Sequence, residues 1–198
     1  MIKFIDRSNE EPLSRFYDSY IFARDKKDLS SDVAIISSFS KKNNEVNSRC
    51  VNIKFIINDE FIFFSNYKST KSFEFNEHNQ VAAVFNWRNI NYQVRIKGIV
   101  SRMPSSFNKD YFLSRDKDKN ALSISSNQSM IISSFDDVKY KYENTKLQKD
   151  LSNCPDYWGG FSIKAYEIEH WEGHEYRLNK RELYRNENNE WKKFILEP

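Results

Sequence analysis

The sequence has 198 residues, a length typical of one domain or of one domain with an added subunit-contact segment. Aromatic residues make up 16% of the chain and there are only four Gly and four Pro, which excludes a disordered, collagen-like or linker-type protein. Lys and Arg sum to 31 and Asp and Glu to 28, so the net charge of +3 excludes nucleic-acid binding by bulk charge. Any anion site must therefore be local.

No apolar run is long enough to cross a membrane, and residues 1–11 lack the apolar centre of a signal peptide. We therefore expect a cytoplasmic protein with no membrane or nucleic-acid partner. Cys50 and Cys154 lie far apart and form no paired motif. Two buried, reduced thiols are the expectation, and a disulfide is the less favoured alternative.

The first half of the chain predicts one helix followed by strand hairpins. Apolar residues at helical spacing predict an amphipathic helix over 11–26, with one face formed by Leu13, Phe16, Tyr17, Tyr20 and Ile21. Alternating apolar residues and turn signals predict the next elements. These are strands over 32–40, 46–57 and 61–64, a short helix from Ser69 or Thr70 to 79, and strands over 80–87 and 91–103.

The middle of the chain, 104–153, is more polar, with a helical pattern through Phe107, Tyr111 and Phe112 and a second helix over 135–149. Three closing strands are predicted over 158–171, 175–184 and 191–196. About seven or eight strands interrupted by four helices predict a mainly β, α+β domain. We expect an antiparallel barrel with helices packed at its ends.

Two short stretches suggest anion binding. Side chains alternate along a strand, so Arg49 and Lys54 are expected on opposite faces, where they serve two neighbouring anions or are merely exposed charges. The polar stretch 64–71 runs into a helix start, where backbone N–H groups, hydroxyls and Lys71 could bind a phosphate or simply cap the helix.

Histidine chemistry is sparse. His170 and His174 are four residues apart, a spacing that would suit a metal on a helix, but Gly173 between them indicates a bend between strands. No further ligand cluster follows, so no metal is expected. The nucleophile, zinc-protease and nucleotide-loop motifs are all absent.

The C-terminal part carries the most distinctive motifs: Trp158-Gly159-Gly160-Phe161, Ile168-Glu169-His170-Trp171 and Arg177-Leu178-Asn179-Lys180-Arg181. Further short motifs precede them in order: Arg49 with Lys54, Ser69-Thr70-Lys71, Gln93-Val94, Tyr111 with Arg115, and Gln128-Ser129. In this order the sequence resembles the pyridoxamine 5′-phosphate oxidase family, flavin enzymes with a split-barrel fold. Without that family, Tyr111 and Arg115 read equally well as a helical packing pair, and Trp158 and Phe161 are expected in the core.

The resemblance implies FMN bound at the interface of a homodimer. It also implies one FMN-binding split-barrel domain over 1–198, in which 154–198 is a dimerisation segment that completes the barrel. The FMN-binding residues carried over from the family are Arg49, Cys50, Val51, Asn52, Phe64, Ser65, Thr70, Lys71, Gln93, Gln128, Ser129, Trp171 and Arg181. Charge-assisted donors for the phosphate and amide groups for the flavin edge are compatible with that role.

The resemblance also implies oxidation of pyridoxamine or pyridoxine 5′-phosphate by O2 to pyridoxal 5′-phosphate and H2O2. The substrate would contact Lys54, Tyr111, Arg115, Lys119, Arg177 and Asn179, and the last two count as catalytic residues. If 175–184 is a strand, alternation puts Arg177 and Asn179 on one face, towards the substrate ring.

The sequence departs from the family pattern at several positions. Thr70 stands where the family has Arg, Lys119 where it has Ser, and Asn179 where it has His, and residues 1–9 show no counterpart of the family segment that helps close the site. Two alternatives therefore stay open. One is a related FMN-dependent oxidase for another planar anion, such as a phenazine precursor, and the other is a non-catalytic binder of flavin or pyridoxal phosphate.

Overall fold

The computed structural model describes residues 1–198. It contains five α-helices and one 3-10 helix: α1 (Glu11–Asp25), α2 (Thr70–Glu77), η1 (Arg88–Ile90), α3 (Ser105–Ser114), α4 (Lys117–Ser125) and α5 (Phe135–Gln148). Ten strands form one sheet: β1 (Lys3–Ile5), β2 (Val33–Ser40), β3 (Glu45–Asn52), β4 (Phe55–Ile57), β5 (Glu60–Asn66), β6 (Gln80–Trp87), β7 (Tyr92–Arg102), β8 (Trp158–Glu172), β9 (Lys180–Glu187) and β10 (Glu190–Leu196).

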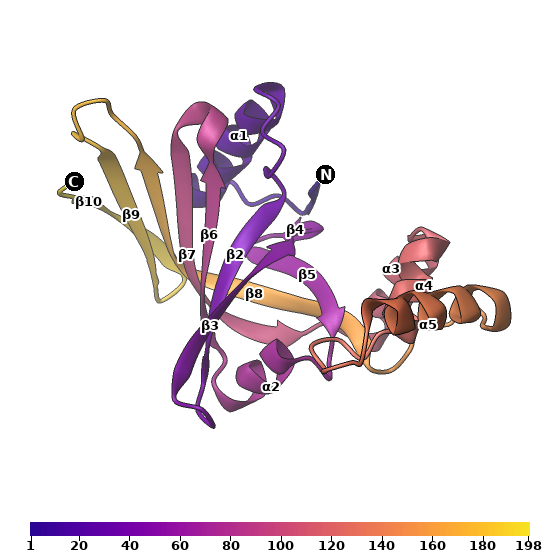
Figure 1. The fold of residues 1–198 in the computed structure, drawn as a ribbon. Helices are drawn as coiled ribbons and strands as arrows, with labels where there is room; N and C mark the ends of the chain where they lie inside the picture. Colours follow the sequence, from indigo (N-terminus) through magenta and orange to yellow (C-terminus); the bar gives the residue numbers. More distant parts are fainter.

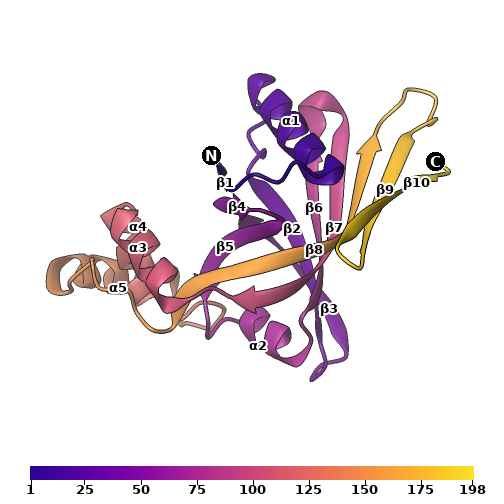
Figure 2. The same cartoon turned by 180° about the vertical axis from the view of Figure 1, so that it is seen from behind.

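The sheet is built around the long strand β8. Its strand order is β1-β4-β5-β8-β7-β6-β2-β3, and β9 with β10 continues from the other half of β8. All pairs are antiparallel except β1 with β4. Figures 1 and 2 show a strongly twisted sheet with α1 at one end, α2 at the other, and α3, α4 and α5 projecting to one side. The predicted split-barrel class is therefore confirmed.

A glycine permits the bulge between β7 and β8. The pairing register shifts between Lys97 and Gly98. A Cβ atom added at Gly98 would lie 2.5 Å from the Ile163 side chain and 2.7 Å from the Lys164 carbonyl oxygen. Only glycine allows the two backbones to approach this closely, which lets β8 bend from β5 towards β9.

Helix α1 closes the core, as its apolar spacing predicts. Phe16 is 1% exposed and its ring centroid lies 5.2 Å from Phe61, 4.9 Å from Phe85 and 5.4 Å from Trp87. The contacts with Phe61 and Phe85 are edge-to-face. Such aromatic contacts add to the free energy gained by burying the rings. Phe161 and Trp158 are also buried, as expected, although Trp158 in addition lines the cleft described below.

The predicted strand over 46–57 is wrong in one respect, because it is two strands. β3 pairs with β2, whereas β4 pairs with β5, so the chain changes partner at Ile53 and Lys54. The Ile53 N–H donates to Asp32 on one side and the Lys54 N–H donates to Ile62 on the other. Strand alternation therefore does not continue to Lys54, and the expected separation of Arg49 and Lys54 onto opposite faces fails. Both residues line the same cleft.

Other differences lie outside the barrel core. The predicted strand over 175–184 begins only at Lys180, and β1 and α4 were not predicted at all. Helix α4 has few apolar residues, but the Asp116 carboxylate caps it by accepting from the Asp118 N–H at 2.9 Å. Both cysteines are free, but Cys50 is exposed, which corrects the expectation of a buried thiol. None of the helices is both long and apolar enough to cross a membrane.

Candidate functional site

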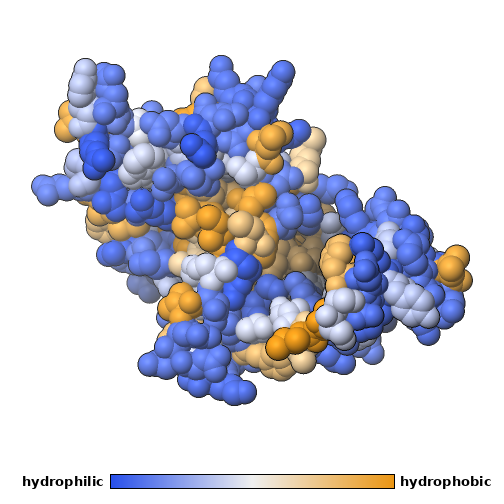
Figure 3. Space-filling view, in the orientation of Figure 1, coloured by the Kyte–Doolittle hydropathy of each residue, from blue (hydrophilic) through white to orange (hydrophobic).

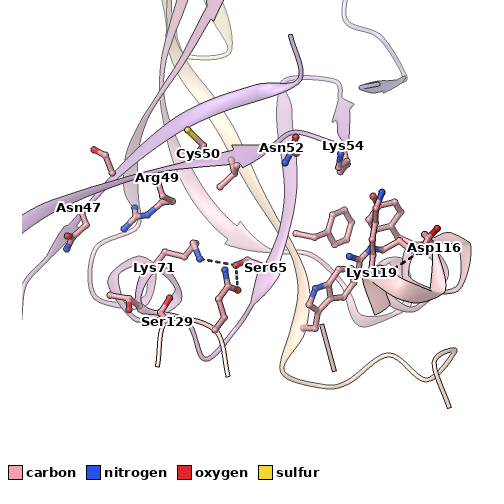
Figure 4. Close-up of a pocket in the computed structure, with 18 of the residues that line it drawn as sticks. Asn47, Arg49, Cys50, Asn52, Lys54, Ser65, Lys71, Asp116, Lys119 and Ser129 are labelled. Carbon is pink, nitrogen blue, oxygen red and sulfur yellow. Dashed lines mark hydrogen bonds between the residues drawn. The ribbon is translucent and has the colours of Figure 1, made fainter. Parts of the chain in front are cut away.

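A cleft of about 1050 Å³ opens between β3, the end of β5, α2 and the α3–α4 pair. It lies at the upper end of the size range of ligand pockets. Figure 4 shows side chains from these elements pointing into it. Fourteen predicted site residues line it: Arg49, Cys50, Val51, Asn52, Lys54, Phe64, Ser65, Thr70, Lys71, Tyr111, Arg115, Lys119, Gln128 and Ser129.

One end of the cleft, formed by Arg49, Ser65, Lys71 and Ser129, is called the β3–α2 end here. The Lys71 ammonium donates to the hydroxyls of Ser65 at 3.1 Å and Ser69 at 3.2 Å. The Gln128 side-chain oxygen accepts from the Ser65 hydroxyl at 3.1 Å. These bonds tie α2, β5 and the segment after α4 together, so the polar groups are positioned before any ligand arrives (Figure 4).

Burial and the neighbouring Arg49 charge lower the pKa of Lys71 to about 8, although Glu74 opposes this. The residue is 7% exposed and its ammonium contacts only hydroxyls. An incoming anion would replace the missing countercharge and favour the protonated form. The burial of Lys71 and the lack of a carboxylate bonded to its ammonium are therefore the properties expected of an anion-binding lysine.

The other end, formed by Lys54, Tyr111, Arg115 and Lys119, is called the α3–α4 end. Burial lowers the pKa of Lys54, and the nearby Lys119 and Arg115 charges lower it further. The Arg115 guanidinium lies 4.5 Å from the centroid of the Trp158 ring, and the Tyr111 ring lies 4.1 Å from that of Phe64. This end combines clustered positive charge with aromatic walls.

The sequence reasoning missed other residues of the cleft, including Lys3 and Asp116. Lys3 reaches the cleft because β1 pairs in parallel with β4, and its N–H donates to the Lys54 carbonyl at 2.9 Å. Residues 1–9, for which no family counterpart was expected, thus still contribute Lys3 to the lining of the cleft. A three-residue strand carries too little pattern to be predicted, whereas the Asp116 cap three residues before Lys119 was a usable signal.

A second group of predicted residues does not line the cleft. Gln93, Trp171 and Arg181 form one row across β7, β8 and β9, because Gln93 pairs with Trp171 and Trp171 pairs with Arg181. The Arg181 guanidinium donates to Glu169 at 2.8 Å. β9 and the end of β8 that pairs with it lie on the opposite side of Figure 1 from α3, α4 and α5.

The second group nevertheless shares a face of the sheet with Cys50, at the edge of the cleft. Cys50, Ile35, Val84 and Arg95 are successive partners across β3, β2, β6 and β7. Gln93 lies two residues from Arg95 and therefore shares that face. Ile35 is 43% exposed there, and Figure 3 shows apolar side chains gathered over the middle of the molecule where Figure 1 has β2.

Arg177 and Asn179 lie in the loop between β8 and β9, so the prediction that strand alternation orients them is wrong. Arg177 is exposed and has a φ of 63°, which is uncommon for a residue other than glycine or asparagine. The Asn179 side-chain oxygen accepts from the His174 N–H at 3.0 Å. Asn179 therefore shapes the loop, and the cleft does not include either residue.

His170 lies beneath Trp171 on the inner face of β8 and is fully buried. Its Nε2 is 3.0 Å from the Pro12 carbonyl oxygen, which can only accept, so Nε2 carries the proton. Nδ1 then accepts from the Tyr92 hydroxyl at 3.0 Å. Burial and the Arg15 charge lower the pKa of His170 to about 3, which keeps it neutral. His174 lies in the exposed loop, and no group of three or more metal-ligating side chains exists.

Two solved structures are similar in fold. The PhzG protein of Burkholderia lata, solved with tetrahydrophenazine-1-carboxylic acid, has a TM-score of 0.89 and 22% identity, covering 98% of this chain and 95% of the other. A pyridoxamine 5′-phosphate oxidase-related, FMN-binding protein of Nostoc punctiforme has a TM-score of 0.76 and 12% identity, covering 92% and 97%. At these identities the likeness concerns the fold.

Sequence relatives are more specific. A pyridoxine/pyridoxamine 5′-phosphate oxidase of Coxiella burnetii is 34% identical over 95% of this chain and 96% of its own. A second one, from Hydrogenovibrio crunogenus, is 29% identical over 98% and 91%. The family model for pyridoxamine 5′-phosphate oxidase matches residues 26–149, and the model for the pyridoxine 5′-phosphate oxidase C-terminal dimerisation region matches residues 158–198. The chain therefore belongs to the pyridoxamine 5′-phosphate oxidase family of oxidoreductases.

Proposed function

We propose that this protein is a homodimeric, FMN-dependent oxidase of pyridoxamine or pyridoxine 5′-phosphate. The observation that carries the proposal is a cleft with a cationic group at each end, in a chain of this family. Bound FMN would accept two electrons from the substrate's aminomethyl or hydroxymethyl carbon, with O2 as final oxidant and H2O2 as product. The protein's own residues bind and orient the two ligands.

The β3–α2 end suits the FMN phosphate. Arg49 and Lys71 offer charge-assisted donors, and Ser129 lies at the same end with a left-handed backbone φ of 71°. Gln128 and Ser65 are already joined by a hydrogen bond, so this part of the cleft is ordered in advance. Preorganised donors lower the entropy lost on binding, which favours a tightly held cofactor.

The α3–α4 end suits a phosphorylated aromatic substrate. Lys54, Arg115 and Lys119 bring three positive charges, and Asp116 is the one carboxylate that lines the cleft. A phosphate dianion matches this excess better than a monocarboxylate does. Tyr111 and Trp158 offer aromatic surfaces for a planar ring, and burial raises the pKa of Tyr111, so its hydroxyl stays protonated.

The homodimer is proposed because the second group lies outside the cleft of its own chain. Gln93, Trp171 and Arg181 share an open sheet face with Cys50 at the edge of the cleft, and a second copy packed on this face could complete the site. The 158–198 match to a dimerisation region supports this arrangement. Sedimentation should give twice the mass of 23.7 kDa, and a monomer with full flavin occupancy would contradict the dimer.

The decisive experiment is a visible spectrum of the FMN-loaded protein without oxygen, before and after addition of pyridoxamine 5′-phosphate. We expect the flavin bands to bleach and to return when O2 is admitted. Lys54→Met should bleach only at much higher substrate concentration. Lys97→Met, which removes an exposed lysine paired with Glu167 outside the cleft, should behave like the parent.

Three other outcomes would contradict the proposed substrate, the proposed reaction or the proposed cofactor. Bleaching by a reduced phenazine-type carboxylate but by no B6 vitamer would indicate the related oxidase. Flavin that binds but is never reduced by either substrate would indicate a non-catalytic binder. Failure to bind FMN would contradict the proposed cofactor.

A further inference from the structure

A buried carboxylate stands directly behind the β3–α2 end of the cleft. Glu74 lies on α2, one turn after Lys71, and its side chain is 2% exposed. Its Oε2 lies 2.8 Å from the Arg49 guanidinium and also accepts from the Ser38 hydroxyl. Its Oε1 accepts from the Asn47 side-chain amide at 2.9 Å. Both carboxylate oxygens of Glu74 are therefore hydrogen-bonded, and the carboxylate forms an ion pair with Arg49.

The charge of Glu74 is not needed to hold Arg49 in place. The Arg49 Nη1 also donates to the Ser38 hydroxyl at 2.5 Å and to the Ile36 carbonyl at 3.4 Å. Both acceptors are neutral and both lie on β2, beside β3. An amide at position 74 would offer the same acceptor oxygen without the charge.

The carboxylate changes the electrostatics of the cleft. Arg49 and Lys71 are the two cations at this end, and Glu74 formally cancels one of them. A unit charge several ångströms from a bound dianion, at the intermediate dielectric of a half-buried site, is worth a large factor in affinity. The same carboxylate should change the affinity for a ligand without a phosphate very little.

We propose that Glu74 is a specificity-determining residue that weakens the preference of this cleft for phosphorylated over unphosphorylated flavin by neutralising Arg49. The inference rests on the proposed function, because it takes the β3–α2 end to be the phosphate end of the FMN site. It differs from a purely positioning role, in which Glu74 would strengthen phosphate binding by aiming Arg49.

The test compares FMN and riboflavin binding to the ligand-free protein, followed by quenching of flavin fluorescence. The quantity of interest is the ratio of the riboflavin to the FMN dissociation constant. In Glu74→Gln this ratio should rise on the order of tenfold, mainly through tighter FMN binding. Glu77→Gln is the matched control, because Glu77 is on the same helix but is exposed and accepts only from the Lys41 and Lys42 N–H groups.

Glu74→Asp separates charge from position, since it keeps the charge but shortens the reach to Arg49. If the charge of residue 74 sets the ratio of the two dissociation constants, the ratio in Glu74→Asp should stay near that of the parent. This variant can be measured even if Glu74→Gln folds poorly. An unchanged or lower ratio in folded Glu74→Gln overturns the inference.

A parent protein that binds neither flavin contradicts the proposed function. The charge effect is then measured with inorganic phosphate alone, through the rise in melting temperature that it produces. Glu74→Gln should be stabilised by phosphate more than the parent and Glu77→Gln. Equal stabilisation of all three proteins overturns the inference independently.

Discussion

The two groups of residues assigned to the flavin are held in different ways. At the β3–α2 end of the cleft, the cations are bonded to partners within the same chain, Arg49 to Glu74 and Lys71 to two serine hydroxyls. On the β7–β9 face, Gln93 and Trp171 form an open row beside an exposed loop that carries the left-handed Arg177. The polar groups of the cleft are thus positioned by contacts within one chain. The second group rests on a packed interior, but its outer surface is not covered by the same chain. The predictions below probe each side of this difference.

The largest expected effect is on the free energy of unfolding and concerns His170, the buried residue beneath Trp171 of the second group. Its pKa is about 3 in the folded chain because of burial and Arg15, and about 6.5 when unfolded. Between these values only the unfolded chain binds the proton, so the free energy of unfolding falls as the pH falls from 6.5 to 3. The full loss is on the order of 5 kcal/mol.

Urea denaturation at several pH values between 7 and 4 measures this effect. His170→Gln can still donate to Pro12 and accept from Tyr92, but it cannot titrate, so it should lose much of the parent's pH dependence. His174→Gln, in the exposed loop, should keep the dependence of the parent. Identical pH profiles for all three proteins would mean that His170 is not the group that makes the fold acid-sensitive.

The next effect concerns the ion pair between Arg49 and Glu74 in the cleft. Arg49→Met leaves the buried Glu74 carboxylate without its countercharge, which should lower the free energy of unfolding by about 3 kcal/mol. The double variant Arg49→Met/Glu74→Gln removes both charges and should recover most of that loss. Arg185→Met, which breaks an exposed pair with Glu167, should cost less than about 1 kcal/mol. If the double variant is no more stable than Arg49→Met, the two charges do not act as a pair.

How far the sequence predicts this fold depends on how local each signal is. The amphipathic spacing around Phe16 and the hairpin of β6 and β7 around η1 are local patterns, and the structure confirms them. The break between β3 and β4 depends on a change of partner strand at Lys54, which no local pattern records. β1 is formed by pairing with β4 over three residues and is equally invisible to periodicity.

The same distinction applies to the site. Family motifs pointed to the residues that would touch the ligands, and most of those in the first half of the chain meet in one cleft. They did not point to Glu74, because its contacts with Arg49 and Ser38 come from the packing of α2 against β2 and β3 and not from a motif. The motifs also named Arg177 and Asn179, but the orientation predicted for them is wrong because the strand begins only at Lys180.

A smaller effect should appear in the pH dependence of FMN binding. The pKa of Lys71 is lowered to about 8, so in the empty cleft it loses its proton above that pH. FMN affinity should therefore fall as the pH rises above 8, by up to about tenfold per pH unit. Lys71→Arg stays charged and should bind FMN with nearly constant affinity up to pH 9. Riboflavin titrations provide the control, since they should show little of this dependence in either protein.

The smallest expected effect concerns the loop, where Asn179 replaces a group that could titrate near neutral pH. Asn179→His should raise the rate of flavin reduction by pyridoxamine 5′-phosphate while changing its dissociation constant little, because the phosphate is assigned to Lys54, Tyr111 and Arg115 at the α3–α4 end. The gain should stay below the roughly 10²–10⁴-fold typical of acid–base groups, since hydride transfer and not proton transfer is expected to limit the step. Asn179→Ala controls for the lost bond to the His174 N–H and should not show the gain. Anaerobic stopped-flow measurements between pH 6 and 8 compare the three proteins. Equal reduction rates in the parent and Asn179→His would show that a titratable group at this position does not affect flavin reduction.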